Sequence, residues 1–373
     1  MKICHVISGY FRNDARVFHR QCKSLQKQNN EVVILSNDGG RNEKLDGIEI
    51  FSCNVFLKKR IFVLLFATFQ FFFSAKKINA DIYQFHSPEL IFLGLYFKLI
   101  GKKIIYDAHE DLPRHILEKE WLLWMPTFLR KFISLATEQY LFWALKKYDR
   151  VITPHHHVLE LFKKNGIECT LVANFPIIKN KKNFLLDDYL IRKKVICYTG
   201  TVYSYSNQEE ILEAISDLKD VRYKIVGFFD EAHLNSLSSH KAFNQLDFSE
   251  RIPWERLSEF YEMTSVGIVV YDYKLNLGGN LGSYGSNKLF EYMEAGLPLV
   301  CTDYKLWKEI IDEYKCGIYV KPGNVSEIKN AISFLLENKE LAYKYGQNGR
   351  RAVEEKFNWS LHQKEYLKIF QNI

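Results

Sequence analysis

The chain has 373 residues, 47% of them hydrophobic and 25% charged, which is typical of a globular protein with two domains, each large enough to have its own core. The seven cysteines are scattered and include no C-x-x-C pair, which argues against a disulfide or zinc framework and indicates reduced thiols in a cytosolic protein. The net charge of +7 predicts attraction to polyanions.

Short apolar strands alternate with helical patterns along the first half of the chain, which predicts a parallel sheet covered by helices. No cleavage-site pattern follows Met1, so we expect no signal peptide. The predicted strands are residues 2–8, 31–36, 48–53, 82–85, 103–107, 150–153 and 169–172, and a helix is predicted at 14–28.

The loop after the first strand contains the first candidate binding residues. Gly9 follows the strand directly, where ligands bind in open α/β sheets and where a glycine lets a substrate approach the backbone. Arg16 and His19 are candidates to meet a phosphate or an acceptor. A tight turn explains Gly9 nearly as well.

A second loop, after the strand at 103–107, contains His109 and Glu110. A histidine between carboxylates at the end of a strand is well placed to hydrogen-bond a sugar hydroxyl or a developing charge. The alternative is that Asp107 caps the next helix and that His109 is a satisfied polar residue. The run His155-His156-His157 lacks metal-ligand spacing, and we expect it to be solvated.

Basic residues lie beside apolar helical segments, at 58–60, at 76–77 and within the aromatic-rich stretch 121–135. This arrangement suits an anionic membrane surface better than a nucleic-acid duplex. The apolar run 61–73 is too short to cross a bilayer. The stretch 121–135 is either a membrane-facing helix or plain core.

The same alternation restarts after a polar, lysine-rich segment near residues 174–188, which we interpret as a linker. Strands are predicted at 194–198, 223–226, 266–271 and 299–302, and helices at 208–218, 255–263, 326–338, 341–356 and 359–370. Gly200 and Thr201 follow the first of these strands, where a glycine permits close approach of a phosphate to the backbone.

The segment 286–301 carries the most information about function. It is predicted to be an amphipathic helix opened by Ser286 and Asn287 and closed by Gly296 and Pro298, with a strand directly after it. The N-terminus of such a helix binds anions such as a diphosphate. Packing of an apolar face explains its leucine, phenylalanine and methionine, but it does not require Lys288 or Glu291.

This segment resembles the nucleotide-binding signature of family 4 of the retaining glycosyltransferases, which have the GT-B architecture of two Rossmann-like, doubly wound parallel-sheet α/β domains facing each other across a cleft. The resemblance covers nearly the whole chain, including Gly9, the Asp-x-His-Glu motif around His109, and Gly200. It implies an acceptor-binding domain at 1–175, a linker at 176–190, a nucleotide-sugar-binding domain at 191–357, and a C-terminal helix at 358–373 that crosses back to the first domain.

The resemblance also implies roles for single residues. Gly9 would lie near the reacting sugar, His109 would contact the donor sugar, and Glu291 would anchor the ribose of the nucleotide. The diphosphate would be bound by N–H groups around Gly200, Ser286 and Asn287. The loop 246–255 would hold the base through backbone groups around Ile252, although a surface turn explains this loop equally well.

The chain departs from the family pattern at two places. Thr201 and Ser206 stand where an arginine and a lysine usually clamp the diphosphate, so Lys288 is the nearest candidate for that charge. Ser283 stands where many members have a glutamate. The glycine-rich loop 278–285 that contains Ser283 and Tyr284 is expected to bring backbone N–H groups to the donor, unless it is a flexible surface loop.

These features predict transfer of a sugar from a nucleotide-diphosphate donor, with a UDP-sugar favoured, to a hydroxyl group, with retention of the anomeric configuration. No cofactor and no metal is expected, since protein groups and a helix end replace Mg²⁺ in this family. The expected acceptor is a lipid-linked saccharide in surface-polysaccharide synthesis, handled by a cytoplasmic protein that is peripheral on the inner membrane face. The alternatives are a nucleotide-sugar epimerase or hydrolase and, with no recognised motif to support it, a basic nucleic-acid-binding protein.

Overall fold

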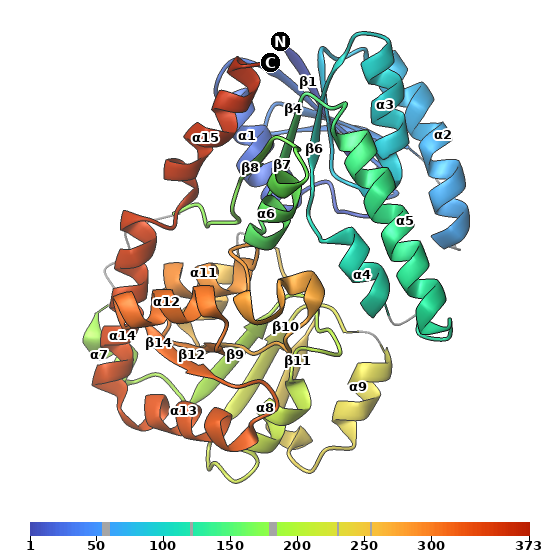
Figure 1. Ribbon diagram of the computed structural model, residues 1–373. Coiled ribbons are helices and arrows are strands. Elements are labelled where there is room, and N and C mark those ends of the chain that lie inside the picture. Colours follow the sequence, from blue (N-terminus) through green and yellow to red (C-terminus); the bar gives the residue numbers. More distant parts are fainter. Residues whose placement is uncertain (54–59, 120–121, 179–184, 230, 254–255) are drawn as a thin grey trace. The chain divides into compact units, whose positions relative to one another are not determined.

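Two parallel sheets organise the computed structural model, which describes all residues except 54–59, 120–121, 179–184, 230 and 254–255 (Figure 1). The chain divides into two units. Unit 1 contains Met1–Asn174, Leu275–Leu277 and His362–Ile373, and unit 2 contains Phe175–Lys274 and Gly278–Leu361. The predicted linker at 176–190 includes helix α7, Leu186–Leu190, while its residues 179–184 lie outside the described part.

The sheet of unit 1 has the order β3-β4-β2-β1-β5-β6-β7-β8 within the described residues, and only β3 runs antiparallel to its neighbour. Without β3, this is the strand order of a Rossmann-like fold, whose switch point lies between β1 and β5. Most central strands are buried along nearly their whole length, as expected for a parallel sheet covered on both faces. The strands are β1 Lys2–Ile7, β2 Glu31–Ser36, β3 Glu43–Leu45, β4 Ile48–Ser52, β5 Ile82–Phe85, β6 Lys103–Asp107, β7 Arg150–Thr153 and β8 Cys169–Leu171.

Helices of unit 1 contribute buried apolar residues to the core around this sheet, as Phe71 of α2, Phe97 of α3 and Leu145 of α5 do. The helix predicted at 14–28 is a π-helix over Ala15–Cys22 followed by α1, and Asp14 caps it by accepting the N–H groups of Arg16 and Val17 at 2.8 and 3.1 Å. The other helices are α1 Lys23–Gln26, α2 Arg60–Ile78, α3 Ile91–Leu99, α4 Leu112–Glu118, α5 Thr127–Leu145, α6 His156–Lys164 and the 3₁₀ turn Pro88–Leu90. The last helix, α15 Trp359–Gln371, contributes Tyr366, whose hydroxyl donates to Gln84 Oε1 at 2.8 Å.

The sheet of unit 2 has the order β11-β10-β9-β12-β13-β14, and all its pairs are parallel in the described part of the chain. This is again a Rossmann-like order, with the switch point between β9 and β12. The strands are β9 Val195–Thr199, β10 Arg222–Val226, β11 Leu246–Ser249, β12 Val266–Val269, β13 Leu299–Thr302 and β14 Gly317–Val320. The helices are α8 Gln208–Ile215, α9 Glu231–Ser238, α10 Leu257–Glu262, α11 Asn287–Glu294, α12 Lys305–Tyr314, α13 Val325–Glu337 and α14 Lys339–Glu355.

The prediction of two doubly wound α/β domains is therefore confirmed, while several short elements were missed. Helix α12 and the strands β3, β11 and β14 were not predicted; these three strands lie at the edges of the two sheets and are less buried than the central strands, so their apolar pattern is weaker. The first residues of the predicted base-binding loop, Leu246–Ser249, form the edge strand β11. None of the helices in the described part of the chain combines the length and apolar composition needed to cross a bilayer.

Candidate functional site

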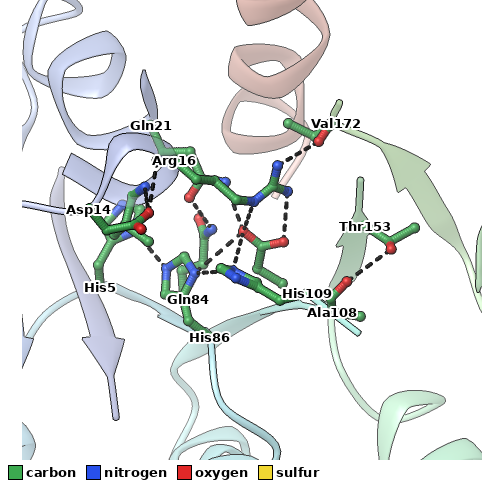
Figure 2. Close-up of polar contacts among 12 residues, drawn as sticks. His5, Asp14, Arg16, Gln21, Gln84, His86, Ala108, His109, Thr153 and Val172 are labelled. Atoms are coloured by element: carbon green, nitrogen blue, oxygen red, sulfur yellow. Dashed lines mark hydrogen bonds and ion pairs between the residues drawn. The ribbon is translucent and has the colours of Figure 1, made fainter. Parts of the chain in front are cut away.

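A buried carboxylate, Asp107, is the centre of a polar cluster at the carboxyl ends of β1, β5 and β6 in unit 1 (Figure 2). It accepts two hydrogen bonds from Arg16, at 2.9 Å from Nε and 2.7 Å from Nη2, and one at 2.7 Å from Gln21 Nε2. Burial alone would favour the neutral acid, but the charge of Arg16 holds the pKa of Asp107 well below its usual value. Asp107 is thus an ionised group inside the fold.

The prediction that Arg16 meets a phosphate or an acceptor is wrong. Its side chain is 4% exposed, and Nη1 donates to the Val172 carbonyl at 2.6 Å and to Asn174 Oδ1 at 2.7 Å, in addition to the two bonds to Asp107. A guanidinium has five N–H donors, and four of them are used here. The aspartate and arginine therefore form a buried bidentate pair that ties the π-helix to β6 and to the end of β8.

His109 lies beside this pair, at the mouth of the cluster. Its Nε2 is 3.3 Å from Asp107 Oδ2 and 3.1 Å from His86 Nδ1, and its ring contacts the ring of Tyr10 at 5.0 Å between centroids. Its side chain is 13% exposed. Asp107 does not cap the next helix, since Asp111 caps α4 by accepting the N–H of Arg114 at 3.3 Å.

Gly9 and Glu110 lie at the same edge of the sheet. Gly9 has φ of +76°, its N–H donates to Asn37 Oδ1 at 3.0 Å, and a Cβ placed there would meet nothing within 4 Å. The positive φ favours glycine, and the open space leaves its backbone approachable. Glu110 is exposed and its carboxylate contacts His115 Nδ1.

The prediction that the histidine run is solvated is wrong for His155. This residue is 9% exposed, directly after β7, and its Nε2 lies 2.7 Å from the backbone oxygen of His109. Burial lowers the pKa of His155 to about 4 and that of His157 to about 3, so both are neutral at pH 7. The carboxyl end of a central strand is buried under the loops that follow it, and the sequence run alone does not reveal this.

Three side chains of the cluster offer atoms at metal-ligand spacing, namely His86, Asp107 and His109, the only such group found among the described residues. The geometry does not favour a divalent cation there. Asp107 Oδ2 already accepts N–H groups from Arg16 and Gln21, and a metal bound to it would lie beside the guanidinium charge. The arrangement of His86, Asp107 and His109 is better explained as a hydrogen-bond network.

The second candidate cluster lies at the switch point of the sheet in unit 2. Gly200 follows β9 with φ of +103°, its N–H donates to the Val226 carbonyl at 2.8 Å, and a Cβ added to it would lie 3.0 Å from Lys288 Nζ. Gly227 approaches from β10 so closely that its own Cβ would overlap the Gly200 carbonyl oxygen, at 2.0 Å. The lack of side chains at both glycines therefore allows the backbones to meet next to the Lys288 ammonium.

Lys288 is held in the first turn of α11 above two buried tyrosines. Its Nζ lies 5.0 Å from the centroid of the Tyr198 ring and 5.8 Å from that of Tyr271. No carboxylate in the described part of the chain lies within ion-pair distance of this ammonium. A cation held by aromatic faces and left without a carboxylate keeps its charge available to an anion.

Glu291, one turn further along α11, also has no hydrogen-bond or ion-pair partner within the described residues, and it is half-buried. The opposite face of the helix is apolar, with Leu289, Phe290 and Met293 fully buried. Ser286 stands at the N-cap position and makes no side-chain hydrogen bond to the first turn, unlike most N-cap serines. Asn287 begins the helix behind it. The apolar residues that pack in the core and the polar residues thus lie on different sides of one helix.

The remaining predicted residues of unit 2 are placed less directly. Ser283 is 5% exposed, its Oγ accepts the N–H of Gly285 at 2.9 Å and its carbonyl accepts Trp307 Nε1 at 2.9 Å. The ring of Tyr284 packs on Phe290 at 5.7 Å between centroids. A Cβ at Gly282 would lie 2.5 Å from Tyr304, so the loop is closely packed at this position.

Thr201 and Ser206, at the positions of the missing clamp, serve the fold. The Thr201 carbonyl accepts the Tyr198 hydroxyl at 2.7 Å, and Ser206 Oγ is fully buried against the backbone of Tyr203. Ile252 lies in the loop after β11 and is half-buried.

The prediction missed His5, His86 and Gln21 in unit 1 and the tyrosine pair in unit 2. Polar residues on β1 and directly after β5 were a usable signal, because these strands are neighbours whose carboxyl ends meet at one edge. The tyrosines gave no signal, since aromatic residues in a strand are usually core.

Two family models match the chain, and together they span most of it. The Glycosyltransferase Family 4 model matches residues 15–175, and the model of the glycosyl transferases group 1 matches residues 183–352. The uncharacterized glycosyltransferase MJ1069 of Methanocaldococcus jannaschii is 28% identical over 325 residues, which cover 81% of this chain and 78% of the relative.

Solved structures share the fold over the full length. The sucrose-phosphate synthase of Thermosynechococcus elongatus aligns with a TM-score of 0.74 at 15% identity, covering 99% of this chain and 98% of that one. The Anabaena protein Alr3699/HepE, solved in complex with UDP and glucose, aligns with a TM-score of 0.72 at 12% identity and covers both chains completely. From the two matched models and this shared architecture, the chain belongs to family 4 of the glycosyltransferases and has the GT-B fold.

Proposed function

We propose that this glycosyltransferase transfers a sugar, with retention of configuration and without a metal, from a UDP-sugar to a hydroxyl group of a lipid-linked saccharide in surface-polysaccharide synthesis. The observation that carries the donor part is the Lys288 ammonium, which lies next to Gly200 and has no carboxylate partner among the described residues. A diphosphate is the anion that this arrangement suits.

The diphosphate leaves with growing negative charge, and positive groups placed beforehand stabilise that charge. Lys288 supplies a full charge, and the N-terminus of α11, near Ser286 and Asn287, supplies the partial charge of a helix end. In this role Lys288 and the helix N-terminus replace the arginine and the lysine that other family members usually have at the positions of Thr201 and Ser206. They also supply the charge neutralisation that a magnesium ion provides in other transferases, which is why we propose a metal-independent reaction.

Two further residues are assigned from the family motifs. Glu291 is proposed to accept a hydrogen bond from the ribose of the nucleotide, and its unpaired carboxylate in the described structure supports this role. His109 is proposed to hydrogen-bond the donor sugar from unit 1, supported by its position at the open edge of the buried cluster. Gly9 and the backbone around Ile252 keep the roles that the family motif implies, near the sugar and the base.

UDP is favoured as the nucleotide because the Anabaena structure of the same fold contains UDP and glucose. We propose the retaining outcome because the family motifs of this chain resemble those of retaining enzymes. Analysis of the newly formed linkage by NMR decides between retention and inversion, and activity after dialysis against EDTA tests the absence of a metal requirement. Inversion of the anomeric centre would refute the first of these proposals, and loss of activity restored by Mg²⁺ would refute the second.

A surface of unit 1 supports the membrane-bound acceptor. Helix α5 exposes large apolar side chains along one face, with Trp124 just before it 79% exposed, Phe128 74% and Phe132 68%. Figure 1 shows α2, α3 and α5 side by side, and α2 exposes Phe73 next to Lys76 and Lys77. Of the predicted stretch 121–135, Leu122 and Ser134 are buried, while most of its large apolar side chains are exposed, so the stretch is not plain core; residue 121 lies outside the described residues.

Aromatic side chains bordered by lysines suit the interface of an anionic bilayer. Flotation with vesicles of phosphatidylglycerol and phosphatidylcholine measures this directly. We expect the wild-type chain to float with the anionic vesicles, and the variant Trp124→Ser/Phe128→Ser/Phe132→Ser to remain at the bottom while keeping its donor-binding affinity. Equal flotation of both proteins would refute the membrane proposal without affecting the donor proposal.

The donor is tested by a thermal-shift screen of UDP, GDP, ADP and dTDP and their sugars, since a ligand that binds the folded state raises its melting temperature. We expect UDP and one or more UDP-sugars to raise it and the matched nucleoside monophosphate to raise it less. Incubation of the stabilising donor alone and with acceptor then separates a transferase from an epimerase or hydrolase, which converts the donor without a second substrate. No stabilisation by any diphosphate would refute the assignment.

A further inference from the structure

Three buried or nearly buried histidines form a row in unit 1 (Figure 2). His5 is on β1, His86 directly follows β5 and His109 follows β6. His5 Nδ1 lies 3.0 Å from His86 Nε2, and His86 Nδ1 lies 3.1 Å from His109 Nε2. The first two rings stack with 5.2 Å between centroids, and the last two are perpendicular. Both nitrogen–nitrogen distances are hydrogen-bond distances, so each contact holds one proton.

His5 and His86, the two fully buried rings of the row, are neutral at pH 7. Burial lowers the pKa of His5 well below its usual value and that of His86 to about 4, the latter in spite of the nearby Asp107 carboxylate. A neutral imidazole carries a proton on one nitrogen and a lone pair on the other. The position of the proton on one ring therefore determines its position on the next.

The inner end of the row sets this direction. His5 Nε2 is buried and has no hydrogen-bond partner among the described residues. A buried N–H without an acceptor is rarer in folded proteins than a buried acceptor without a donor, so the proton of His5 lies on Nδ1 and is donated to His86 Nε2. The proton of His86 then lies on Nδ1, where it points at His109 Nε2.

Asp107 does not reverse this order. Its Oδ2 lies 3.3 Å from both His86 Nδ1 and His109 Nε2, but it already accepts shorter bonds from Arg16 Nε at 2.9 Å and Gln21 Nε2 at 2.7 Å. The contact between His86 Nδ1 and His109 Nε2, at 3.1 Å, is shorter than the contact of either nitrogen with Asp107 Oδ2.

We propose that His5 and His86 are positioning residues that hold His109 in the tautomer with its proton on Nδ1. This nitrogen has no hydrogen-bond partner in the described part of the chain, so its N–H is available to an oxygen of a bound sugar. His109 thereby acts toward the ligand as an N–H donor. The tautomer follows from unit 1 alone, and only its catalytic consequence rests on the proposed function.

The direct test is NMR of the full chain labelled with ¹⁵N in histidine, because long-range proton–nitrogen correlations distinguish the two neutral tautomers. The variant His109→Asn identifies the signals of His109 by their loss. We expect a protonated Nδ1 and an unprotonated Nε2 at neutral pH. A proton on Nε2, or a doubly protonated ring, would overturn the proposal whatever the enzyme does.

Two substitutions of His86 separate positioning from simple packing. His86→Asn keeps an amide N–H close to the place of Nδ1, and His86→Leu removes it. We expect the asparagine variant to keep the His109 tautomer. In the leucine variant the proton of His109 should lie on Nε2, from which it donates a hydrogen bond to Asp107 Oδ2. His240→Asn, which removes a histidine that contacts Glu213 in unit 2, should leave the His109 signals unchanged.

Kinetics provides the second measurement. With donor and acceptor identified, His86→Leu should lower kcat about tenfold or more and change KM for the donor by less than about threefold, and His86→Asn should restore most of the loss. If the leucine variant does not fold, the spectrum of the unmodified chain still decides the tautomer. If neither the wild-type chain nor any variant transfers a sugar while His109 shows the expected tautomer, the proposed function is refuted and the tautomer proposal is not.

Discussion

Replacement of Lys288 by alanine is the most informative perturbation of the donor site. The ammonium has no ion-pair partner among the described residues and lies over the faces of Tyr198 and Tyr271, at 5.0 and 5.8 Å. Its loss should therefore lower the free energy of unfolding by only ~0.5–1 kcal/mol, the usual size of a cation–π contact. The effect on catalysis should be larger, because a charge-assisted hydrogen bond to the departing diphosphate contributes ~1.5–3 kcal/mol.

Loss of the ~1.5–3 kcal/mol from this hydrogen bond corresponds to a decrease of about 10- to 150-fold in kcat/KM for the nucleotide-sugar donor, measured from initial rates. The affinity for UDP, measured by calorimetry, should also become weaker. Lys308→Ala is a matched control, since Lys308 Nζ lies over the Tyr319 ring at 4.7 Å on α12 in the same unit. The control should leave kcat/KM within about twofold. A folded Lys288→Ala protein that keeps wild-type kcat/KM and UDP affinity would refute the reasoning.

Further predictions concern pH and two glycines, Gly200 after β9 and Gly227 after β10. His86 and His155 each have a folded-state pKa of about 4, lowered by burial from ~6.5 in an unfolded chain, so the unfolded chain binds more protons between these values. The free energy of unfolding from urea titrations should therefore decrease as the pH falls from about 6.5 toward 4, by at most ~1.4 kcal/mol per pH unit for each histidine, and a flat profile would contradict their burial. Gly200→Ala should weaken UDP binding, seen as a smaller thermal shift by UDP, because the added Cβ lies 3.0 Å from Lys288 Nζ at a φ of +103°; an unchanged shift would show that this contact is not part of the site. Gly227→Ala should lower the melting temperature itself, since its Cβ would overlap the backbone of Gly200 at 2.0 Å, and a melting temperature equal to wild type would contradict the packing described.

Much of the fold was readable from the sequence because the evidence for it is local. The strands are continuous apolar runs that end in glycine or polar loops, and the order of strands and helices predicts parallel sheets with ligand residues at the carboxyl ends of the strands. The helix at 286–294 was predictable for the same reason, since its apolar face and its polar start are both visible within a few residues.

The candidate site was only partly predictable. The sequence pattern indicated His109, Lys288, Glu291 and Gly200 as site residues, and their roles remain predictions; His109 and Gly200 lie in loops after strands, and Lys288 and Glu291 lie on α11. Arg16 was assigned to a ligand because an arginine in a loop after a strand has the right charge for a phosphate. Its actual partner, Asp107, is 91 residues away in the sequence, and no local pattern joins the two.

The sequence by itself determined the alternation of strands and helices, the two sheets and the helix whose start carries the unpaired lysine, because these depend on periodicity and on residue types within short windows. Only the tertiary structure decided which charged groups neutralise one another and which remain available. It placed Arg16 on Asp107 and three histidines in one row, while it left Lys288 over two tyrosine rings without a carboxylate within the described residues. Pairing of charges depends on distances of a few ångströms between strands far apart in the chain, and these distances are set by the packing of the sheet and not by any one segment.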